Sequence, residues 1–408
     1  MAAVSIEEAR NAVLEDVAPL AGESVDLANA LGRALGSPVV ADCHVPPADN
    51  AGMDGIAVRW EDTRDASPER PVRLRLLGTI GAGQVTDLVV TANCAAKIMT
   101  GAAVPPGADA VIPVEDVEYD GAHAIVRRAA RLGDHVRPMG EDVKDGQRVF
   151  DVGEEITSAH IGVLASLGVA TVPVGKRPRV AIIATGSELV GVSETPGRGQ
   201  IRNSNSLALV AAAKAAGALA EDRGHVTDDL EKITRSLLGA AVSHNIVISS
   251  GGVSVGEFDF VKSAMKSLGV EMRFDKVAQK PGKPMSYGRI GDQTHVFGLP
   301  GNPAAALVCF HVYIKPLIRR LQGFMELDAP LAWGRLVGRF ASKGRPSFAR
   351  VIPEATPEGY RVHLAGSQSS GLLLPMARGR ALAHFPARDD AYGDGDLVRF
   401  QFLDGGVG

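Results

Sequence analysis

Cysteine is scarce in this chain of 408 residues, which contains only Cys43, Cys94 and Cys309. Three widely separated cysteines do not form the disulfide framework that stabilises many small secreted domains. Aromatic residues make up only 5% of the chain, and its most apolar stretch, residues 161–174, is too short to cross a bilayer. The acidic start of the sequence is unlike a signal peptide, which begins with basic residues and a continuous apolar segment. We therefore expect a cytoplasmic protein without a membrane contact.

An excess of positive charge is missing as well. The chain has 43 lysines and arginines against 47 acidic residues, a formal net charge of −4. Proteins that bind nucleic acids usually carry a strongly basic surface, so we expect no nucleic-acid partner. A charged fraction of 22% is ordinary for a globular protein. The length exceeds that of one ordinary domain, and two to four domains are expected.

The residue pattern changes several times along the chain. A helix is predicted near the start, before residue 45, and alternating apolar residues predict short strands over residues 72–137. Residues 145–171 return to a strand–helix pattern that we expect to pair with the first segment, which makes the β-rich segment an insertion. Over residues 177–325, strands alternate with helices and predict a parallel sheet covered on both faces. Short strands predict a second β domain from residue 326.

Three carboxylates follow three successive predicted strands. Glu188 lies in TGSEL, Asp228 follows Thr227, and Asp259 ends the sequence GEFD. Because ligands of parallel sheets bind at the carboxyl ends of the strands, these side chains could share one edge and hold Mg²⁺. Taken singly, each is more often a helix cap or a first-turn acid that stabilises the helix dipole.

Lysines are concentrated in the segment KVAQKPGKP. Lys276, Lys280 and Lys283 have no acidic residue between them, and the intervening prolines and glycine predict a rigid, extended loop. Such a loop could bind an oxyanion such as a phosphate, although a run of lysines is about as often only a solvated surface.

Residues 252–256 read GVSVG and match the G-x-S-x-G motif of serine hydrolases. In a hydrolase Ser254 would be the nucleophile, with His295 or His311 as its base. The alternative is a glycine-rich turn whose backbone N–H groups bind an anion at a helix N-terminus. We favour this anion-binding turn because the hydrolase leaves the three carboxylates unexplained.

Several other motifs complete a pattern that runs through nearly the whole chain. They occur in the order MDG, MTGAAVPPGADAVIPVED, RPMGEDV, ATGSELV, IRNSNS, SSGGVSVGEFD, KPGKP and GLPGNPAAA. In these motifs and their order the chain resembles the molybdopterin molybdotransferase family, which includes MoeA and the gephyrin E domain. Two departures are Ile56, which removes a hydroxyl beside MDG, and Ser187, where an aspartate is frequent.

The resemblance implies a multidomain α/β plus β fold. Its parts are an elongated discontinuous domain (1–45 and 146–176), an inserted β-rich domain (46–145), a three-layer α/β molybdopterin-binding domain (177–325) and a C-terminal β-barrel domain (326–408). It also implies a homodimer whose active site lies in a cleft between the protomers. The implied reaction inserts molybdate into adenylylated molybdopterin, the product of an upstream adenylyltransferase, and releases AMP with the help of Mg²⁺.

The resemblance also implies site residues. The catalytic positions match Asp54, Thr100, Asp142, Glu188, Asp228 and Asp259, of which the last three are the expected metal ligands. The substrate-binding positions match Ser254, Lys276, Lys280, Lys283, Pro284, Pro300, Pro303, Arg350 and Ser369. A non-catalytic scaffold of the same fold is an alternative from another functional class, but a scaffold has no physical need for this set of carboxylates and lysines.

Overall fold

The computed structural model describes residues 2–252, 260–291 and 294–403. The chain forms two compact units, which are described separately. The first unit contains Met1–Ser37, Val152–Thr157 and Thr171–Gly408, and the second contains Pro38–Asp151 and Ser158–Ala170. No helix in the described ranges is long and apolar enough to span a membrane.

A six-stranded sheet forms the centre of the first unit, in the strand order β16-β13-β17-β20-β19-β18. The strands are β13 (Arg179–Thr185), β16 (Leu219–Val226), β17 (Ile246–Ser250), β18 (Glu271–Phe274), β19 (Ser286–Ile290) and β20 (Thr294–Leu299). The first four strands in the sheet order are parallel, as predicted. However, β19 runs antiparallel to both of its neighbours, β18 and β20, so the predicted parallel sheet contains one antiparallel strand. Parallel neighbours need a crossover connection of about a dozen residues or more, usually a helix, and no helix lies between β18 and β19.

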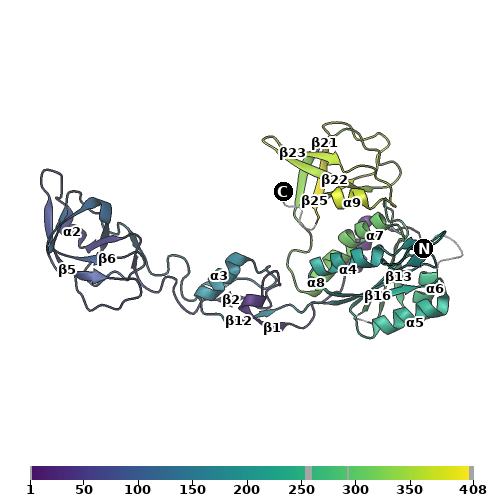
Figure 1. Ribbon diagram of the computed structural model, residues 1–408, viewed down its shortest axis with the longest axis horizontal. Helices are drawn as coiled ribbons and strands as arrows, with labels where there is room; N and C mark the ends of the chain where they lie inside the picture. Colours follow the sequence, from purple (N-terminus) through teal and green to yellow (C-terminus); the bar gives the residue numbers. More distant parts are fainter. Residues whose placement is uncertain (1, 253–259, 292–293, 404–408) are drawn as a thin grey trace. The chain divides into compact units, whose positions relative to one another are not determined.

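Helices cover both faces of this sheet (Figure 1). One face packs against α4 (Asn205–Ala215), α7 (Pro303–Cys309) and α8 (Lys315–Leu321), and the other against α5 (Leu230–Ala241) and α6 (Phe260–Ser267). Because side chains alternate along a strand, Val180 and Ile182 of β13 enter the first core while Ala181 and Ile183 enter the second.

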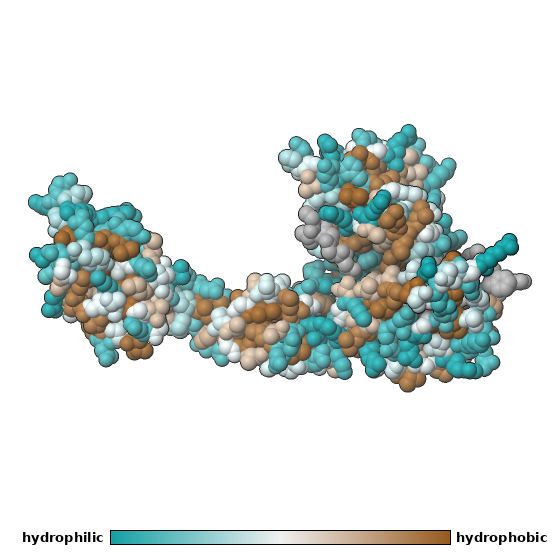
Figure 2. Space-filling model, viewed as in Figure 1, coloured by the Kyte–Doolittle hydropathy of each residue, from teal (hydrophilic) through white to brown (hydrophobic). Residues whose placement is uncertain are grey.

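Several of the helices bury apolar side chains on one face only. In α5, Ile233, Leu237 and Ala240 are buried at helical spacing, and hydrophilic residues cover much of the surface over α5 and α6 in Figure 2. The N-cap of α5 is Asp229, whose side chain accepts a hydrogen bond from the Lys232 N–H. Helix α1 (Ile6–Leu14) buries Ala9 and Val13 against the first core.

The helical segment that follows Asn302 contains a π-helical stretch, η3 (Phe310–Ile314), between α7 and α8. Pro316 lies at the start of α8 and has no N–H to donate to the carbonyl of Val312, four residues earlier. That carbonyl instead accepts a hydrogen bond from the Arg10 guanidinium at 2.6 Å. The π-helical segment therefore occurs where Pro316 removes a backbone hydrogen-bond donor.

The C-terminal part of the first unit is a closed barrel in the order β21-β23-β22-β24-β25. Its strands are β21 (Leu331–Val337), β22 (Ser347–Thr356), β23 (Gly359–Leu364), β24 (Ala381–Phe385) and β25 (Leu397–Phe402), and α9 (Leu374–Arg378) precedes β24. Phe385 and Phe400 are fully buried inside the barrel with Leu336, Val351 and Val362. The barrel confirms the predicted C-terminal β-barrel domain.

The second unit is built around another six-stranded sheet, in the order β7-β4-β6-β5-β9-β8. Its strands are β4 (Gly55–Val58), β5 (Val72–Ile80), β6 (Cys94–Ile98), β7 (Ala110–Pro113), β8 (Val117–Asp120) and β9 (His123–Val126). Buried residues that include Ile56, Leu74 and Val126 fill one core of the unit. The sheet agrees with the predicted β-rich segment.

Segments that are distant in the sequence pair on either side of this β-rich segment. In the first unit, β1 (Glu23–Asp26) pairs with β12 (Thr171–Val174). In the second unit, β2 (Val39–Val40) pairs with β11 (Arg148–Phe150), and α3 (Ser158–Ser166) follows. The predicted pairing of the later segment with the start of the chain is confirmed, as is the fold class. The four domain boundaries given above stay predictions.

Several short elements remain in the two units. They are η1 (Leu27–Asn29), β3 (Asn50–Ala51), α2 (Trp60–Thr63), η2 (Val114–Asp116), β10 (Val136–Arg137), β14 (Leu189–Val190) and β15 (Ile201–Arg202). Of these, β14 and β15 pair in parallel beside the turn that follows β13.

The central strand β17 provides a test of this core. Ile248 lies in the middle of β17 and is 0% exposed. Replacing it with alanine should lower the free energy of unfolding of the first unit by about 2–5 kcal/mol, measured by urea denaturation. The control Val242→Ala, at a side chain that is 82% exposed, should change it by less than about 0.5 kcal/mol. Equal effects of the two substitutions would contradict the described core.

Candidate active site

The parallel strands of the first unit end at a cavity of about 740 Å³, which we call the strand-end cavity. Its walls come from the turns that follow β13, β16, β17 and β20, and from the start of α4. They include Thr185, Glu188, Arg202, Asn205, Asp228, Ser250, Gly251, Pro284, Pro300, Asn302 and Pro303. A cavity at the carboxyl ends of parallel strands is the usual position of a ligand site in such a sheet.

Two of the three predicted metal-binding carboxylates line this cavity. Glu188 and Asp228 are both exposed, and their turns are tied together by two hydrogen bonds. The Ser187 N–H donates to Asp228 Oδ2 at 3.2 Å, and the Asp228 N–H donates to Ser187 Oγ at 3.1 Å. Ser187, the departure from the family pattern, therefore supports Asp228. The third carboxylate, Asp259, lies outside the described residues, as does Ser254.

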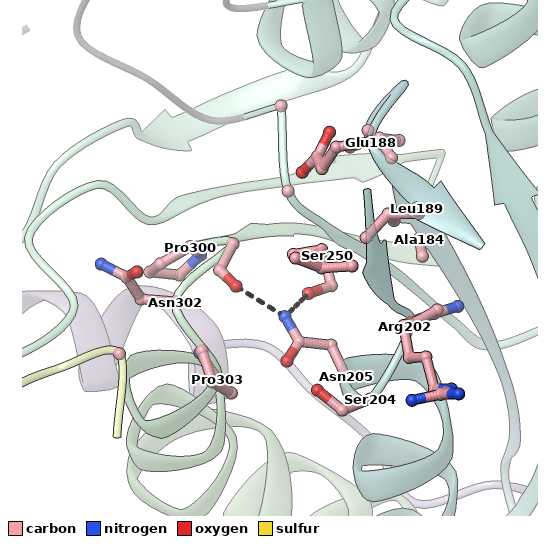
Figure 3. A pocket seen from close by; sticks show the side chains of 18 of the residues that line it. Ala184, Glu188, Leu189, Arg202, Ser204, Asn205, Ser250, Pro300, Asn302 and Pro303 are labelled. Carbon is pink, nitrogen blue, oxygen red and sulfur yellow. Dashed lines mark hydrogen bonds between the residues drawn. The ribbon is translucent and has the colours of Figure 1, made fainter. Parts of the chain in front are cut away.

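Amide side chains connect the walls of the strand-end cavity. The Asn205 amide donates to Ser250 Oγ and to the Gly301 carbonyl, both at 2.8 Å (Figure 3). These contacts join the start of α4 to the end of β17 and to the turn before α7. On the sequence, Asn205 was part of the motif IRNSNS without an individual role. Its position at a helix start just after a strand was the signal that could have identified it.

The glycine turn after β17 lies directly against the end of β13. A Cβ atom added to Gly251, whose φ is +102°, would lie 2.2 Å from the Thr185 carbonyl oxygen. Only glycine fits so close an approach with this backbone conformation. The Thr185 hydroxyl, which is buried below the same turn, has no hydrogen-bond partner among the described residues.

A second cavity of about 630 Å³, which we call the lysine cavity, adjoins the first and shares Pro284, Pro300 and Asn302 with it. Lys280, Lys283 and Arg345 line it, and within the described residues its lining contains no aspartate or glutamate. Its described lining therefore carries three formal positive charges without a carboxylate among them. Arg345 was not identified on the sequence; its signal was a second arginine in the segment GRPSFAR.

Residues 276–285, which we call the lysine loop, have a backbone that is fixed by hydrogen bonds at two places. The Lys280 N–H donates to the Pro346 carbonyl at 2.9 Å, and the Phe348 N–H donates to the Lys280 carbonyl at 2.7 Å. The Lys283 carbonyl accepts from the N–H groups of Val277 and Met285, both at 3.0 Å. The two bonds of Lys280 attach the loop to the start of the barrel strand β22, and the two bonds of Lys283 lie within the loop. The side chains of Lys280 and Lys283 stay exposed.

The other predicted substrate-binding residues have different positions. Ser369 lines the lysine cavity, whereas Arg350 is 0% exposed and lines neither cavity. The Arg350 guanidinium donates to the carbonyls of Ser367 at 3.2 Å and Ser369 at 3.0 Å, and burial lowers its pKa. Lys276 also lies outside both linings, and its carbonyl accepts from the Val4 N–H at 3.0 Å.

Three predicted catalytic residues belong to the second unit. Asp54 Oδ1 accepts hydrogen bonds from the Thr100 N–H at 2.6 Å and from the Thr100 hydroxyl at 2.7 Å. These two bonds, the hydroxyl bond first, hold the pKa of Asp54 below its ordinary value. Asp142 is exposed in a turn, where its N–H donates to the Val45 carbonyl at 3.0 Å. Within the described ranges, no group of three or more histidine, cysteine or acidic side chains could hold a metal ion.

Comparisons with known proteins assign the chain to a family. Family models match for the MoeA N-terminal region (domain I and II) over residues 4–168, a probable molybdopterin binding domain over 181–320, and the MoeA C-terminal region (domain IV) over 334–403. The molybdopterin molybdenumtransferase of Staphylococcus epidermidis is 33% identical over 398 residues, which cover 97% of this chain and 94% of that protein. This chain belongs to the MoeA family.

Two further relatives support this assignment to the MoeA family. Molybdopterin molybdenumtransferase 2 of Mycobacterium tuberculosis is 39% identical over 356 residues, covering 85% of this chain and 87% of that protein. The crystal structure of the molybdopterin biosynthesis moeA protein from Pyrococcus horikoshii has a TM-score of 0.87 and 29% identity, covering 98% of this chain and 100% of that one. The resemblance and the fold class predicted from the motifs are confirmed.

The serine hydrolase alternative is not favoured by these relatives. Its two candidate bases are also poorly placed, since His295 is 2% and His311 is 6% exposed. His295 Nδ1 is hydrogen-bonded to the Tyr287 hydroxyl at 2.9 Å, and burial lowers its pKa to about 3. Neither ring is open to a substrate.

The Asp54–Thr100 contact can be tested by titration. Thr100→Val removes the hydroxyl donor and should raise the pKa of Asp54 toward its ordinary value, whereas Thr100→Ser keeps the donor and should leave the pKa low. NMR titration of the Asp54 carboxyl measures both. Because the folded pKa is depressed, any stabilisation from this contact is present above the unfolded pKa and is lost as the pH falls through the folded value. The same Asp54 pKa in the two variants would contradict this account.

Proposed function

We propose that this protein is a molybdopterin molybdotransferase, which inserts molybdate into adenylylated molybdopterin and releases AMP in the last step of molybdenum cofactor biosynthesis. The observation that carries the proposal is the pair of adjoining cavities with different charges. The described lining of the strand-end cavity contains two exposed carboxylates and one arginine, Arg202, whereas that of the lysine cavity contains three cations and no carboxylate. The enzyme is a transferase.

The strand-end cavity is suited to the phosphate-bearing substrate. Cleavage of a phosphoanhydride depends mainly on positioning and on neutralising charge at the phosphates. Mg²⁺ is commonly bound by one or two carboxylates together with phosphate oxygens and water, so the pair Glu188 and Asp228 fits this ion. When bound, Mg²⁺ would neutralise charge on the phosphates, and Asp259 is proposed as a further ligand. Pro300 and Pro303 shape the turn before α7, and Asn205 holds that turn against β17.

The lysine cavity is suited to molybdate. Molybdate is a tetrahedral dianion, and its oxygens accept hydrogen bonds from ammonium, guanidinium and hydroxyl groups. Lys280, Lys283 and Ser369 are proposed to bind it, and Arg345 adds a third cation in the same lining. Arg350 would act indirectly by orienting Ser369, because its guanidinium donates a hydrogen bond to the Ser369 carbonyl. Pro284 lies on the wall that the two cavities share.

The remaining parts of the proposal rest on the family. We propose a cytoplasmic homodimer that receives its substrate from a molybdopterin adenylyltransferase. Ser254 and Lys276 keep their proposed roles in substrate binding. Asp54, Thr100 and Asp142 keep their proposed catalytic roles, and the Thr100 contact that maintains Asp54 as a carboxylate agrees with such a role.

An assay of AMP release from adenylylated molybdopterin tests the proposal. With molybdate and Mg²⁺ the wild-type protein should release AMP, and Asp228→Asn should lower the rate at least about tenfold because it removes a charge from the phosphate site. The asparagine can still accept the hydrogen bond from the Ser187 N–H, so the turn should remain intact.

The matched control is Asp222→Asn, at an exposed carboxylate of β16, the strand that precedes Asp228. Asp222 accepts a hydrogen bond from the Gly224 N–H and lies outside the cavity lining. Its rate should stay close to that of the wild type. A wild-type protein that releases no AMP would favour the non-catalytic scaffold, and a fully active Asp228→Asn variant would remove Asp228 from the mechanism.

A further inference from the structure

A chain of buried hydrogen bonds supports the lysine loop, and its first member, Gln279, also belongs to the lining of the lysine cavity. Gln279 is 0% exposed and Tyr313 is 1% exposed. The Gln279 Nε2 group donates to the Pro281 carbonyl at 2.9 Å, and the Tyr313 hydroxyl donates to Gln279 Oε1. Both ends of the amide are therefore engaged, one by the loop and the other by η3.

The loop also packs closely against the helix that carries Tyr313. A Cβ atom added to Gly282, whose φ is +93°, would lie 2.5 Å from Cys309 Sγ and 2.7 Å from Gln279 Nε2. The Gln279 amide itself approaches Cys309 Sγ at 3.6 Å. Because a real Cβ essentially never comes so close to another atom, this position requires glycine, and the loop has little freedom to move toward the helix.

Burial fixes the protonation states in this chain. It raises the pKa of Tyr313 far above the working range, and the nearby Cys309 adds to the shift. Burial also raises the pKa of Cys309 to about 12. Near neutral pH the phenol therefore stays protonated and remains a donor to Gln279, and the thiol stays neutral.

We propose that Gln279 and Tyr313 are positioning residues for oxyanion binding, which fix the Pro281 carbonyl and thereby hold Lys280 and Lys283 at the wall of the lysine cavity. Tyr313 acts only through Gln279. The inference rests on the proposed function, since it assigns the loop the task of binding molybdate.

The arrangement explains how flexible side chains form a defined site. A lysine ammonium group sits on a four-carbon stem, so its position depends on a fixed backbone. Lys280 is anchored to the barrel by two backbone bonds, and the Lys283 carbonyl is anchored by two more. The Gln279 side chain provides the anchor between them, at Pro281. Loss of this anchor should weaken anion binding because the loop must then be ordered when the anion binds.

The test compares two buried tyrosines that each lose a hydrogen-bonded hydroxyl. Tyr313→Phe breaks the chain behind the loop. Tyr287→Phe is the matched control, because Tyr287 is 0% exposed and its hydroxyl bonds His295 at 2.9 Å and Arg289 at 3.1 Å without touching the loop. Calorimetric titration with sodium molybdate should show a Kd about five- to tenfold higher for Tyr313→Phe. The control should stay within about twofold of the wild type, although both variants lose a comparable buried contact.

Hydrogen exchange of residues 276–285 provides a second readout that requires no molybdate. The amides of Val277, Lys280 and Met285 are hydrogen-bonded within the loop or to the barrel, and they should exchange faster in Tyr313→Phe than in Tyr287→Phe. Gln279→Met removes the amide that bonds both Tyr313 and the Pro281 carbonyl, and it should likewise speed the exchange of these amides. Unchanged exchange and unchanged Kd in Tyr313→Phe, or equal changes in the control, would overturn the inference.

The two hypotheses can fail separately. If the wild-type protein binds no molybdate, the proposed oxyanion site fails, and the exchange comparison still decides whether Gln279 and Tyr313 position the loop. If the wild-type protein binds molybdate but Tyr313→Phe behaves like the control, only the positioning role fails.

Discussion

Opposite charges that serve neighbouring ligands must be kept from neutralising one another, and the first unit depends on this separation. Glu188 and Asp228 line the strand-end cavity together with one cation, Arg202, whose guanidinium donates to the Glu194 carbonyl at 3.0 Å. Lys280, Lys283 and Arg345 line the lysine cavity. The two cavities meet at Pro284, Pro300 and Asn302, whose side chains carry no charge. Cations and carboxylates placed on one shared wall would form ion pairs and lose much of their attraction for a substrate.

The two sets of charges are separated because they lie in different kinds of connection between strands. The carboxylates follow parallel strands, whose ends meet at one edge of the sheet. The lysines lie in the connection between the antiparallel strands β18 and β19, which is bonded to the barrel strand β22. Arg345 lines the same cavity from the connection between the barrel strands β21 and β22.

The sequence predicted local features better than the contacts that close the site. The strand–helix alternation predicted the α/β core, and the charges of Glu188, Asp228, Lys280 and Lys283 already indicated two kinds of ligand. The antiparallel direction of β19 could not be predicted from periodicity, because strand direction depends on the connection and not on the strand residues. Arg345 was missed because its distance in the sequence hides its proximity to the lysine loop. Gln279 and Tyr313 carry no charge, and only the fold brings them together.

Crystallographic anomalous scattering from tungstate, a heavy tetrahedral analogue of molybdate, tests the central claim most directly. Crystals of the wild-type protein soaked in tungstate should show one dominant anomalous peak within hydrogen-bonding reach of Lys280, Lys283 and Arg345. Soaked crystals of the Arg345→Ala variant should show a weaker peak at the same place, because one of three cations is lost. A dominant peak at another part of the protein, or no peak at saturating tungstate, would contradict the assignment of the lysine cavity to the oxyanion.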